Sequence, residues 1–201
     1  MRKTARYILV LFKVPGFLVA RMYNFILLKA SNVWYESYPF ITGKLSIKGE
    51  GRIRIGKSVI INSRLNANPV GLATQTVLFA YKDSEIIIGN NVGISNALLC
   101  SMSKIIIEDD VRVGGGAQIF DNDFHSIRYE ERMMAPDTNI SIKPVVIKKG
   151  AFIGCNSIIC KGVIVGERSI VAAGSVVVKS IPDDEIWGGN PAIFLKKINN
   201  I

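Results

Sequence analysis

His125 is the residue of this sequence best suited to move a proton. It is the only histidine among 201 residues, and an imidazole accepts a proton near neutral pH, so His125 is a candidate general base. Asp121 and Asp123 lie close to it in the chain and can orient the ring or stabilise the imidazolium that forms. Either aspartate can instead cap a turn, a common role for this residue type in loops.

A repeat of six residues predicts the framework that positions this segment. From Ile147 to Val177 every sixth residue is aliphatic, and the residue two positions before each is small or β-branched. Side chains two apart on a strand point to the same side, so both positions face inward and the next two residues form a corner. Three such flat sides close a coil of eighteen residues, and each coil buries its aliphatic residues against the next. A helix or a heptad coiled coil, with periods of about 3.6 and 3.5, does not match.

The same frame occurs upstream with one residue inserted. Its inward positions there are Ile88, Ile94, Cys100, Ile107, Val113 and Ile119. The inserted residue falls between Cys100 and Ile107, which are seven apart.

The frame is interrupted by a mostly polar segment at 120–146, and this segment contains His125. A long loop that leaves a rigid repeat is a common place for functional residues. One coil earlier, Ser95 and Asn96 are candidates to hydrogen-bond an acceptor. An asparagine at a solenoid corner explains Asn96 equally well.

Charge and cysteine content limit the setting of the protein. The chain has a net charge of +9, and its first 35 residues contain six lysines and arginines and no acidic residue. No basic helix with interleaved aromatic residues and no nucleic-acid motif is present, so binding to DNA or RNA is not expected. The three cysteines have no paired spacing, which indicates reduced thiols and a cytoplasmic setting. No metal site is predicted.

The segment from Tyr7 to Ala30 is apolar but too interrupted to span a bilayer. Its apolar runs are shorter than the roughly 20 residues of a spanning helix, and Pro15-Gly16 predicts a break between two short amphipathic helices. One interpretation is a peripheral anchor at the inner face of the membrane. The side chains immersed in that case are Phe12, Phe17, Leu18 and Phe25. The other interpretation is that the helices pack on the body of the protein or between subunits.

The repeat, with glycine often following the aliphatic residue, resembles the hexapeptide-repeat acyltransferases. From Ile86 onward the sequence is similar to the maltose and galactoside O-acetyltransferase branch, and most similar to the members that acetylate bacterial surface polysaccharides or their sugar precursors. The matching segments are 121–126, 174–182 and 188–192. The resemblance implies an all-β fold, a left-handed parallel β-helix with short N-terminal helices and a C-terminal tail. The implied parts are an N-terminal helical segment at 1–45, the β-helix at 46–185 with an active-site loop at 120–146, and a C-terminal extension at 186–201.

The resemblance also implies an activity. Acetyl-CoA is the implied acyl donor, His125 the general base of a ternary complex, and a hydroxyl of a sugar or polysaccharide the acceptor. Matching positions imply coenzyme contacts at Phe152, Gly154, Cys155, Ala173, Gly174, Val178 and Lys179. Family members are homotrimers with active sites between subunits, and the same assembly is expected here.

Three positions depart from the family pattern. Phe152 stands where a tryptophan is usual, Val178 replaces a threonine and lacks its hydroxyl, and Ile193 replaces a basic residue. Lys196 or Lys197 can substitute for that basic residue. The departures concern the shape of the pocket wall and the contacts to the coenzyme phosphates.

Four other functions share parts of this pattern. A γ-type carbonic anhydrase uses the same coil but needs three histidines for zinc, and this chain has one. An N-acetyltransferase of a nucleotide-linked amino sugar differs only in its acceptor. A xenobiotic acetyltransferase has little use for the basic, apolar N-terminus, and the retained loop and histidine argue against a non-catalytic scaffold.

Overall fold

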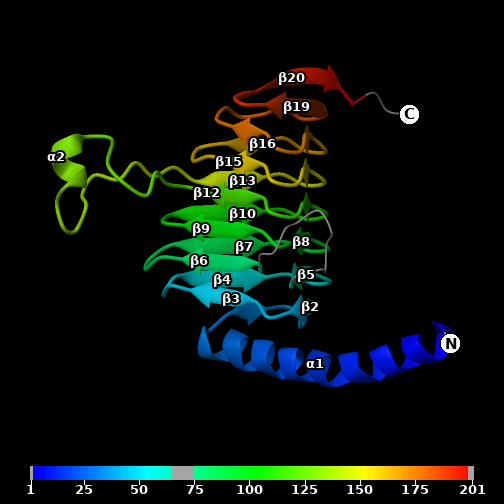
Figure 1. The fold of residues 1–201 in the computed structure, drawn as a ribbon. Helices are drawn as coiled ribbons and strands as arrows, with labels where there is room; N and C mark the ends of the chain where they lie inside the picture. Colours follow the sequence, from blue (N-terminus) through cyan, green and yellow to red (C-terminus); the bar gives the residue numbers. More distant parts are fainter. Residues whose placement is uncertain (1, 65–74, 199–201) are drawn as a thin grey trace.

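A three-sided solenoid of parallel strands makes up most of the molecule (Figure 1). The structure is a computed structural model. It describes the backbone of residues 2–64 and 75–198, and the side chains of residues 16–64 and 75–198. Helix α1 (Arg2–Ala30) lies across one end of the solenoid, an insert with helix α2 (Tyr129–Arg132) projects from its side, and a β-hairpin closes the other end.

Each coil contributes one strand to each of three sheets. Sheet A consists of β1 (Trp34–Tyr35), β4 (Arg52–Ile55), β7 (Glu85–Ile88), β10 (Lys104–Ile107), β13 (Val145–Ile147) and β16 (Ile164–Val165). Sheet B consists of β2 (Phe40–Gly43), β5 (Ile60–Ser63), β8 (Gly93–Ser95), β11 (Arg112–Val113), β14 (Phe152–Ile153), β17 (Ile170–Val171), β19 (Glu185–Gly189) and β20 (Ala192–Lys197). Sheet C consists of β3 (Ser46–Lys48), β6 (Val77–Ala80), β9 (Leu98–Ser101), β12 (Gln118–Phe120), β15 (Ile158–Ile159) and β18 (Val176–Val177). The closing hairpin of β19 and β20 pairs antiparallel.

The predicted inward positions form the core. The aliphatic residues of the last two coils are all fully buried: Ile147, Ile153, Ile159, Val165, Val171 and Val177. The small positions two before them are buried as well. Their serines satisfy backbone groups of the corner, as Ser157 and Ser175 do by donating to the Ala172 carbonyl oxygen at 3.0 and 2.6 Å. The three-sided parallel β-helix predicted from the period is confirmed.

One position of the predicted frame is wrong. Strand pairing places Leu99, not Cys100, beside Ile119, so Leu99 is the inward residue of that coil. The corner before Leu99 is one residue shorter than predicted, and the extra residues lie in the next corner, at 101–103. The sequence could not separate the two positions because Leu99 and Cys100 are both apolar and both buried.

The two ends of the solenoid differ from the predicted boundaries. The N-terminal segment forms one continuous helix of 29 residues rather than two helices broken at Pro15-Gly16. A proline inside a helix costs about 3 kcal/mol and can kink a helix without ending it, and the leucines, lysines and arginines on both sides favour helix. The first coil begins at Trp34, which pairs with Arg54, before the predicted start of the β-helix at 46. At the other end β19 still pairs with β17, so the C-terminal extension begins as part of sheet B.

Helix α1 closes the first coil. Among the side chains of α1 that the structure describes, Ala20, Asn24 and Leu28 form a buried stripe. The Asn24 amide nitrogen donates to the Gly43 carbonyl oxygen at 2.8 Å, and its oxygen accepts from the Leu45 N–H at 2.9 Å. These bonds satisfy backbone groups at the open end of the sheets, where an uncovered strand edge would otherwise pair with other chains.

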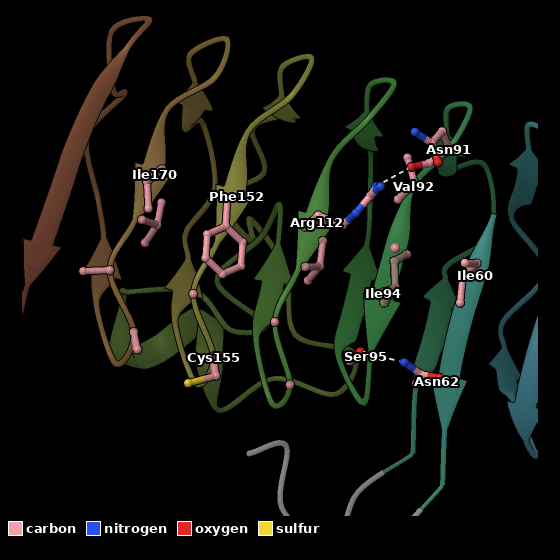
Figure 2. Close-up of a pocket in the computed structure, with 18 residues that line it drawn as sticks. Ile60, Asn62, Asn91, Val92, Ile94, Ser95, Arg112, Phe152, Cys155 and Ile170 are labelled. Carbon is pink, nitrogen blue, oxygen red and sulfur yellow. Dashed lines mark hydrogen bonds between the residues drawn. The ribbon is translucent and has the colours of Figure 1, made fainter. Parts of the chain in front are cut away.

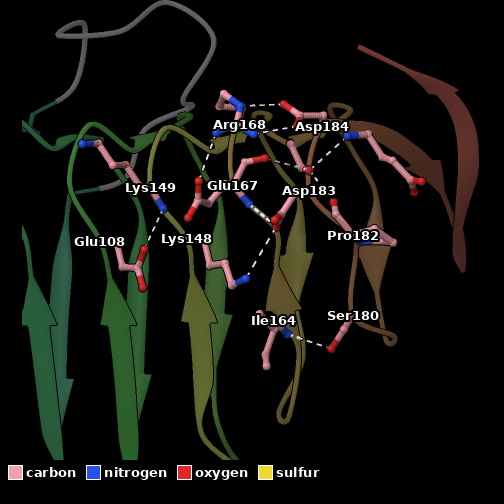
Figure 3. A network of polar contacts seen from close by, with 12 residues as sticks. Glu108, Lys148, Lys149, Ile164, Glu167, Arg168, Ser180, Pro182, Asp183 and Asp184 are labelled. Atoms are coloured by element: carbon pink, nitrogen blue, oxygen red, sulfur yellow. Dashed lines mark hydrogen bonds and ion pairs between the residues drawn. The ribbon is translucent and has the colours of Figure 1, made fainter. Parts of the chain in front are cut away.

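The corner between sheets A and B is a regular ladder of polar residues (Figure 3). At successive levels a residue with positive φ donates its N–H to the preceding coil, as Arg168 does to the Lys149 carbonyl oxygen at 2.9 Å. The Arg168 side chain also contacts Asp184 at 2.6 Å, and this hydrogen bond raises the pKa of the guanidinium and lowers the pKa of the Asp184 carboxyl. The pair is exposed and adds little stability. The ladder repeats the same turn without interruption, whereas the insert leaves from a different corner, between sheets C and A.

Candidate functional site

A groove of about 550 Å³ runs along the outer face of sheet B (Figure 2). Its floor is the outward row of β5, β8, β11, β14 and β17, which consists of Ile60, Gly93, Arg112, Phe152 and Ile170. Parallel pairing in register sets equivalent residues of successive coils beside one another. The groove is therefore a direct product of the repeat.

Among the described residues that line this groove, Arg112 has the one charged side chain. Gly93, one coil earlier, leaves room for it, since a Cβ at Gly93 would lie 3.0 Å from Arg112 Cδ. The guanidinium donates to the carbonyl oxygens of Asn91 and Val111. A guanidinium has five N–H donors, so further donors remain for an anionic ligand. Arg112 was not among the predicted site residues, and the glycine at the equivalent position one coil earlier was the available clue.

Of the two predicted acceptor-binding residues, Ser95 lines the groove and Asn96 does not. Ser95 Oγ accepts a hydrogen bond from the Asn62 amide at 3.1 Å (Figure 2). Asn96 is buried, has a φ of 45° and donates to the Arg64 carbonyl oxygen at 3.2 Å. The equivalent corner residues of later coils also have positive φ: Gly116, Asn156 and Gly174. Asparagine and glycine tolerate this conformation best, and the corner interpretation accounts for Asn96.

Four of the predicted coenzyme residues line the groove. They are Phe152, Gly154, Cys155 and Ala173. Phe152 is exposed on the outer face, whereas Gly154 is required by the stacking of the coils. A Cβ at Gly154 would lie 2.5 Å from the Ala173 backbone nitrogen. Close packing of the coils therefore requires glycine at position 154, whether or not a ligand is bound.

The other predicted coenzyme residues lie outside the groove. Gly174 is a corner residue with a φ of 71°. Val178 and Lys179 follow β18 in sheet C, and both are exposed. A single chain thus does not bring these three residues together with the floor of the groove. Within the described residues, no three histidine, cysteine or acidic side chains gather to hold a metal ion.

The insert that carries His125 is anchored by a buried aspartate. The Asp121 carboxylate accepts hydrogen bonds from Ser101 Oγ at 2.8 Å and from the N–H groups of Met102 at 2.7 Å and Ser103 at 2.8 Å. Its carbonyl oxygen accepts the Lys143 N–H at 2.8 Å, which joins the two ends of the insert. Asp121 was predicted to orient the histidine ring. Its carboxylate instead holds the turn of the neighbouring coil, because a buried carboxylate needs several donors.

Asp123 is also directed away from the ring. Its carboxylate pairs with Lys161 Nζ at 2.7 Å, and its backbone oxygen accepts the His125 N–H at 2.7 Å. Phe124 has a φ of 62°, and its N–H donates to Asn122 Oδ1 at 2.9 Å. Asp123 therefore shapes the turn that presents His125, and its carboxylate does not contact the imidazole.

The ring partner of His125 is Asp137, twelve residues further along the insert. His125 Nδ1 lies 2.9 Å from Asp137 Oδ2. An ionised carboxylate only accepts hydrogen bonds, so Nδ1 carries the proton and Nε2 is the acceptor of the neutral ring. Asp137 also accepts the Ser126 N–H at 3.2 Å, and its side chain is 14% exposed while the His125 side chain is 67% exposed. An exposed imidazole oriented by a carboxylate in this way can accept a proton from a hydroxyl.

His125 and the groove lie on different parts of one chain. The insert leaves the solenoid between β12 and β13, at the corner between sheets C and A (Figure 1). In a three-sided coil this corner is opposite sheet B, which carries the groove.

A family model matches part of the solenoid. Residues 144–179 match the model described as bacterial transferase hexapeptide, six repeats. Hexapeptide repeats wind into a left-handed β-helix, so the predicted hand and fold class are confirmed.

Solved structures share the same architecture. A hexapeptide-repeat acetyltransferase of Vibrio cholerae, in complex with acetyl-CoA, is 25% identical over 87% of this chain and 76% of that chain, with a TM-score of 0.54. The polySia-specific acetyltransferase NeuO is 20% identical over 83% and 82%, with a TM-score of 0.60. A variant of the N-acyltransferase AntD of Bacillus cereus, in complex with dTDP-4-amino-4,6-dideoxyglucose and coenzyme A, is 22% identical over 87% and 88%, with a TM-score of 0.55. NeuO and AntD are similar in fold alone.

Proposed function

We propose that the chain is a hexapeptide-repeat acyltransferase that transfers the acetyl group of acetyl-CoA to a sugar hydroxyl of a bacterial surface polysaccharide or its precursor. The observation that carries the proposal is the pairing of His125 with Asp137 on the insert of the solenoid. The similar protein from V. cholerae binds acetyl-CoA, and NeuO acts on polySia, a polymeric sugar acceptor.

In the proposed reaction His125 acts first as base and then as acid. Its Nε2 takes the proton of the acceptor hydroxyl while the hydroxyl oxygen attacks the thioester carbonyl and forms the C–O bond. Asp137 keeps the proton on Nδ1 and stabilises the imidazolium. A backbone N–H of a neighbouring coil supports the oxyanion. The tetrahedral intermediate then breaks the C–S bond, and the coenzyme leaves as the free thiol with the proton from the imidazolium.

We assign the groove on sheet B to the coenzyme. The apolar side chains of Phe152 and Ile170 suit the pantetheine arm, and the small residues Gly154 and Ala173 leave room for the arm beside the backbone. Arg112 supplies positive charge for an anionic group of the coenzyme. Such a groove needs few polar groups to orient a ligand of this size.

We propose a homotrimer with active sites between subunits, the usual assembly of hexapeptide acetyltransferases. The insert and the groove lie on opposite sides of one chain, so a second copy is needed to bring a histidine to a coenzyme. The tip of the insert also exposes apolar side chains that a second copy can cover: Ile127, Tyr129, Met133 and Met134. We propose that the coenzyme bound in the groove of one subunit is also contacted by three residues of a neighbouring subunit: Gly174, Val178 and Lys179.

An N-acetyltransferase of a nucleotide-linked amino sugar is the second candidate. The fold shared with AntD, which binds such a sugar, favours it. The same histidine and carboxylate can assist attack by an amine. The two candidates differ in the bond formed, an ester or an amide.

The experiment that tests the proposal measures thiol release from acetyl-CoA with a panel of neutral sugars, amino sugars and oligosaccharides. An acetyl product that mild alkali removes, identified by mass spectrometry, supports the proposed O-acetyl transfer. An alkali-stable product on an amino sugar contradicts it in favour of N-acetyl transfer. If no acceptor releases thiol, both proposals fail and the chain is a binding solenoid. Independently, excess coenzyme A should raise the melting temperature of an enzyme with an intact coenzyme site, by mass action on the native state.

A further inference from the structure

From residue 16 onward, helix α1 is apolar on the face that it turns away from the solenoid. It contacts the first coil through a narrow stripe that includes Ala20 and Leu28. On the opposite face Met22 and Ile26 are 66% and 59% exposed. Other large apolar side chains of the same helix are exposed as well: Phe17, Leu18, Val19 and Phe25.

This exposed face needs a covering partner. The helix that caps a solenoid normally carries polar residues on its outer face, because that face meets water. A contiguous apolar patch of this kind marks a surface that contacts another molecule or a membrane. The packing of α1 on the solenoid does not depend on that face, since Asn24 and the buried stripe already anchor the helix.

The charge of the molecule is concentrated at the same end. Residues 1–57 contain eleven lysines and arginines and two acidic residues, whereas residues 58–201 contain fourteen of each. The net charge of +9 therefore lies in α1 and the first part of the solenoid, which adjoin one another at one end of the stack (Figure 1). An anionic surface is the complementary partner, because each basic residue near an anionic bilayer is attracted to it.

The basic residues of this end stand beside the apolar face. Arg21 lies over the Tyr38 ring at 5.8 Å, and Lys44 lies over the Tyr23 ring at 5.2 Å. Lys29 is exposed near the end of the helix. Long basic side chains of this kind reach phosphate headgroups while apolar neighbours enter the acyl region.

We propose that the outer face of α1 binds the surface of an anionic lipid bilayer, with the helix lying in the plane of the membrane. In this arrangement α1 rests in the headgroup region with its apolar face buried by about 5–10 Å. None of the helices in the described residues qualifies as a bilayer-spanning segment. Because α1 lies across the end of the stack, the solenoid stands away from the bilayer and sheet B remains accessible (Figure 1). This binding is independent of acetyl transfer.

Vesicle co-sedimentation of the full chain tests the proposal. The vesicles contain phosphatidylcholine alone or an equimolar mixture with phosphatidylglycerol. We expect binding to the anionic vesicles that weakens as salt is raised, because exposed charges are screened. The double substitution Met22→Glu and Ile26→Glu should lower the partition coefficient by about tenfold or more, because it removes apolar contacts and adds negative charge.

A matched control places the same charges at the other end of the solenoid. Ile193 and Leu195 in β20 are 61% and 54% exposed, and the double substitution Ile193→Glu and Leu195→Glu should leave vesicle binding unchanged. Circular dichroism and the melting temperature check that both variants fold. Equal binding by wild type and the α1 variant would overturn the proposal. If the α1 variant binds vesicles as the wild type does but light scattering shows a smaller assembly, the proposal is overturned and the outer face of α1 is a contact between copies of the chain.

Discussion

The groove on sheet B and the insert that carries His125 position their residues by different means. In the groove, Phe152 stands beside Arg112 because their strands pair in register, and the same register repeats from coil to coil. In the insert, His125 is held by side-chain hydrogen bonds within an irregular segment, chiefly the contact with Asp137. Sheet register forms the groove, whereas polar contacts within the insert position His125, the proposed base.

Because of this difference, the residues that stabilise the fold and the residues proposed for the chemistry lie in different regions of the molecule. The solenoid depends on close backbone packing, as at Gly154, and on the buried aliphatic residues. The tip of the insert is exposed and contributes little to the core. Substitutions at the exposed tip of the insert should therefore reduce activity with little effect on stability, and substitutions in the stack should lower the free energy of unfolding.

The largest expected effect is that of His125→Ala. Removal of a general base costs on the order of a hundredfold or more in kcat. The side chain is 67% exposed, so the melting temperature should stay close to that of the wild type. The measurement is thiol release from acetyl-CoA with the best acceptor of the panel. Full activity of the variant would show that His125 is not the base.

A smaller loss is expected for the substitution Asp137→Asn. The carboxylate contacts Nδ1 of the ring and acts by positioning the base, so kcat should fall by about tenfold to a hundredfold. The KM for acetyl-CoA should not change, because Asp137 does not line the groove. Asp137→Glu keeps the charge and should recover part of the activity.

Asp123→Asn is the matched control for that variant. Asp123 lies two residues from His125 in the chain, but its carboxylate pairs with Lys161 rather than with the ring. We expect a loss in kcat smaller than that of Asp137→Asn. A larger loss in kcat for Asp123→Asn than for Asp137→Asn would mean that Asp123 orients the ring, as its position in the sequence suggested.

The same comparison explains which features were predictable from the sequence. Groove residues such as Phe152 and Cys155 were implied by the resemblance to the family, and the regular period of six let their positions be matched to the family pattern. Asp137 could not, since no local pattern indicates that the insert folds back on itself to bring it to His125. Asp121 was assigned to the wrong partner for the related reason that nearness in sequence does not reveal which backbone donors surround a buried carboxylate. The continuity of α1 through Pro15 was missed because a proline lowers helix stability without fixing where the helix ends.

Two substitutions in the solenoid should separate two reasons for glycine, close packing and a positive φ: Gly154→Ala and Gly174→Ala. A Cβ at Gly154 would lie 2.5 Å from the Ala173 nitrogen and 2.6 Å from the Val171 oxygen, and both are backbone atoms. We expect a loss of about 1–3 kcal/mol in the free energy of unfolding, the usual cost of overpacking. Gly174 has open space around it but a φ of 71°, so alanine there should cost about 1 kcal/mol.

Urea denaturation at one fixed protein concentration measures both losses, because the stability of an oligomer depends on concentration. A greater loss for Gly174→Ala than for Gly154→Ala would contradict the close stacking of the coils. His125→Ala, measured in parallel, should have little effect on the same scale.

The smallest expected effect concerns Cys100, which lies beneath the base of the insert. Burial, together with the charge of Asp121, raises the pKa of the Cys100 thiol to about 11. In the unfolded chain the pKa of a thiol is about 8.5. Unfolding therefore releases a proton from this thiol only above about pH 8.5, and the stability that depends on the neutral thiol is lost progressively as the pH rises from about 8.5 toward 11.

The variant Cys100→Ala isolates this contribution, because it has no thiol to titrate at that position. The difference in unfolding free energy between wild type and variant should be constant up to about pH 8. As the pH rises toward 10, the wild type should lose stability relative to the variant. Burial also raises the pKa of Cys160, but that thiol is present in both proteins and cancels in the difference. A difference that stays constant through pH 10 would mean that Cys100 is not buried beside a carboxylate, and Asp121 would then be available to the histidine rather than committed to the solenoid.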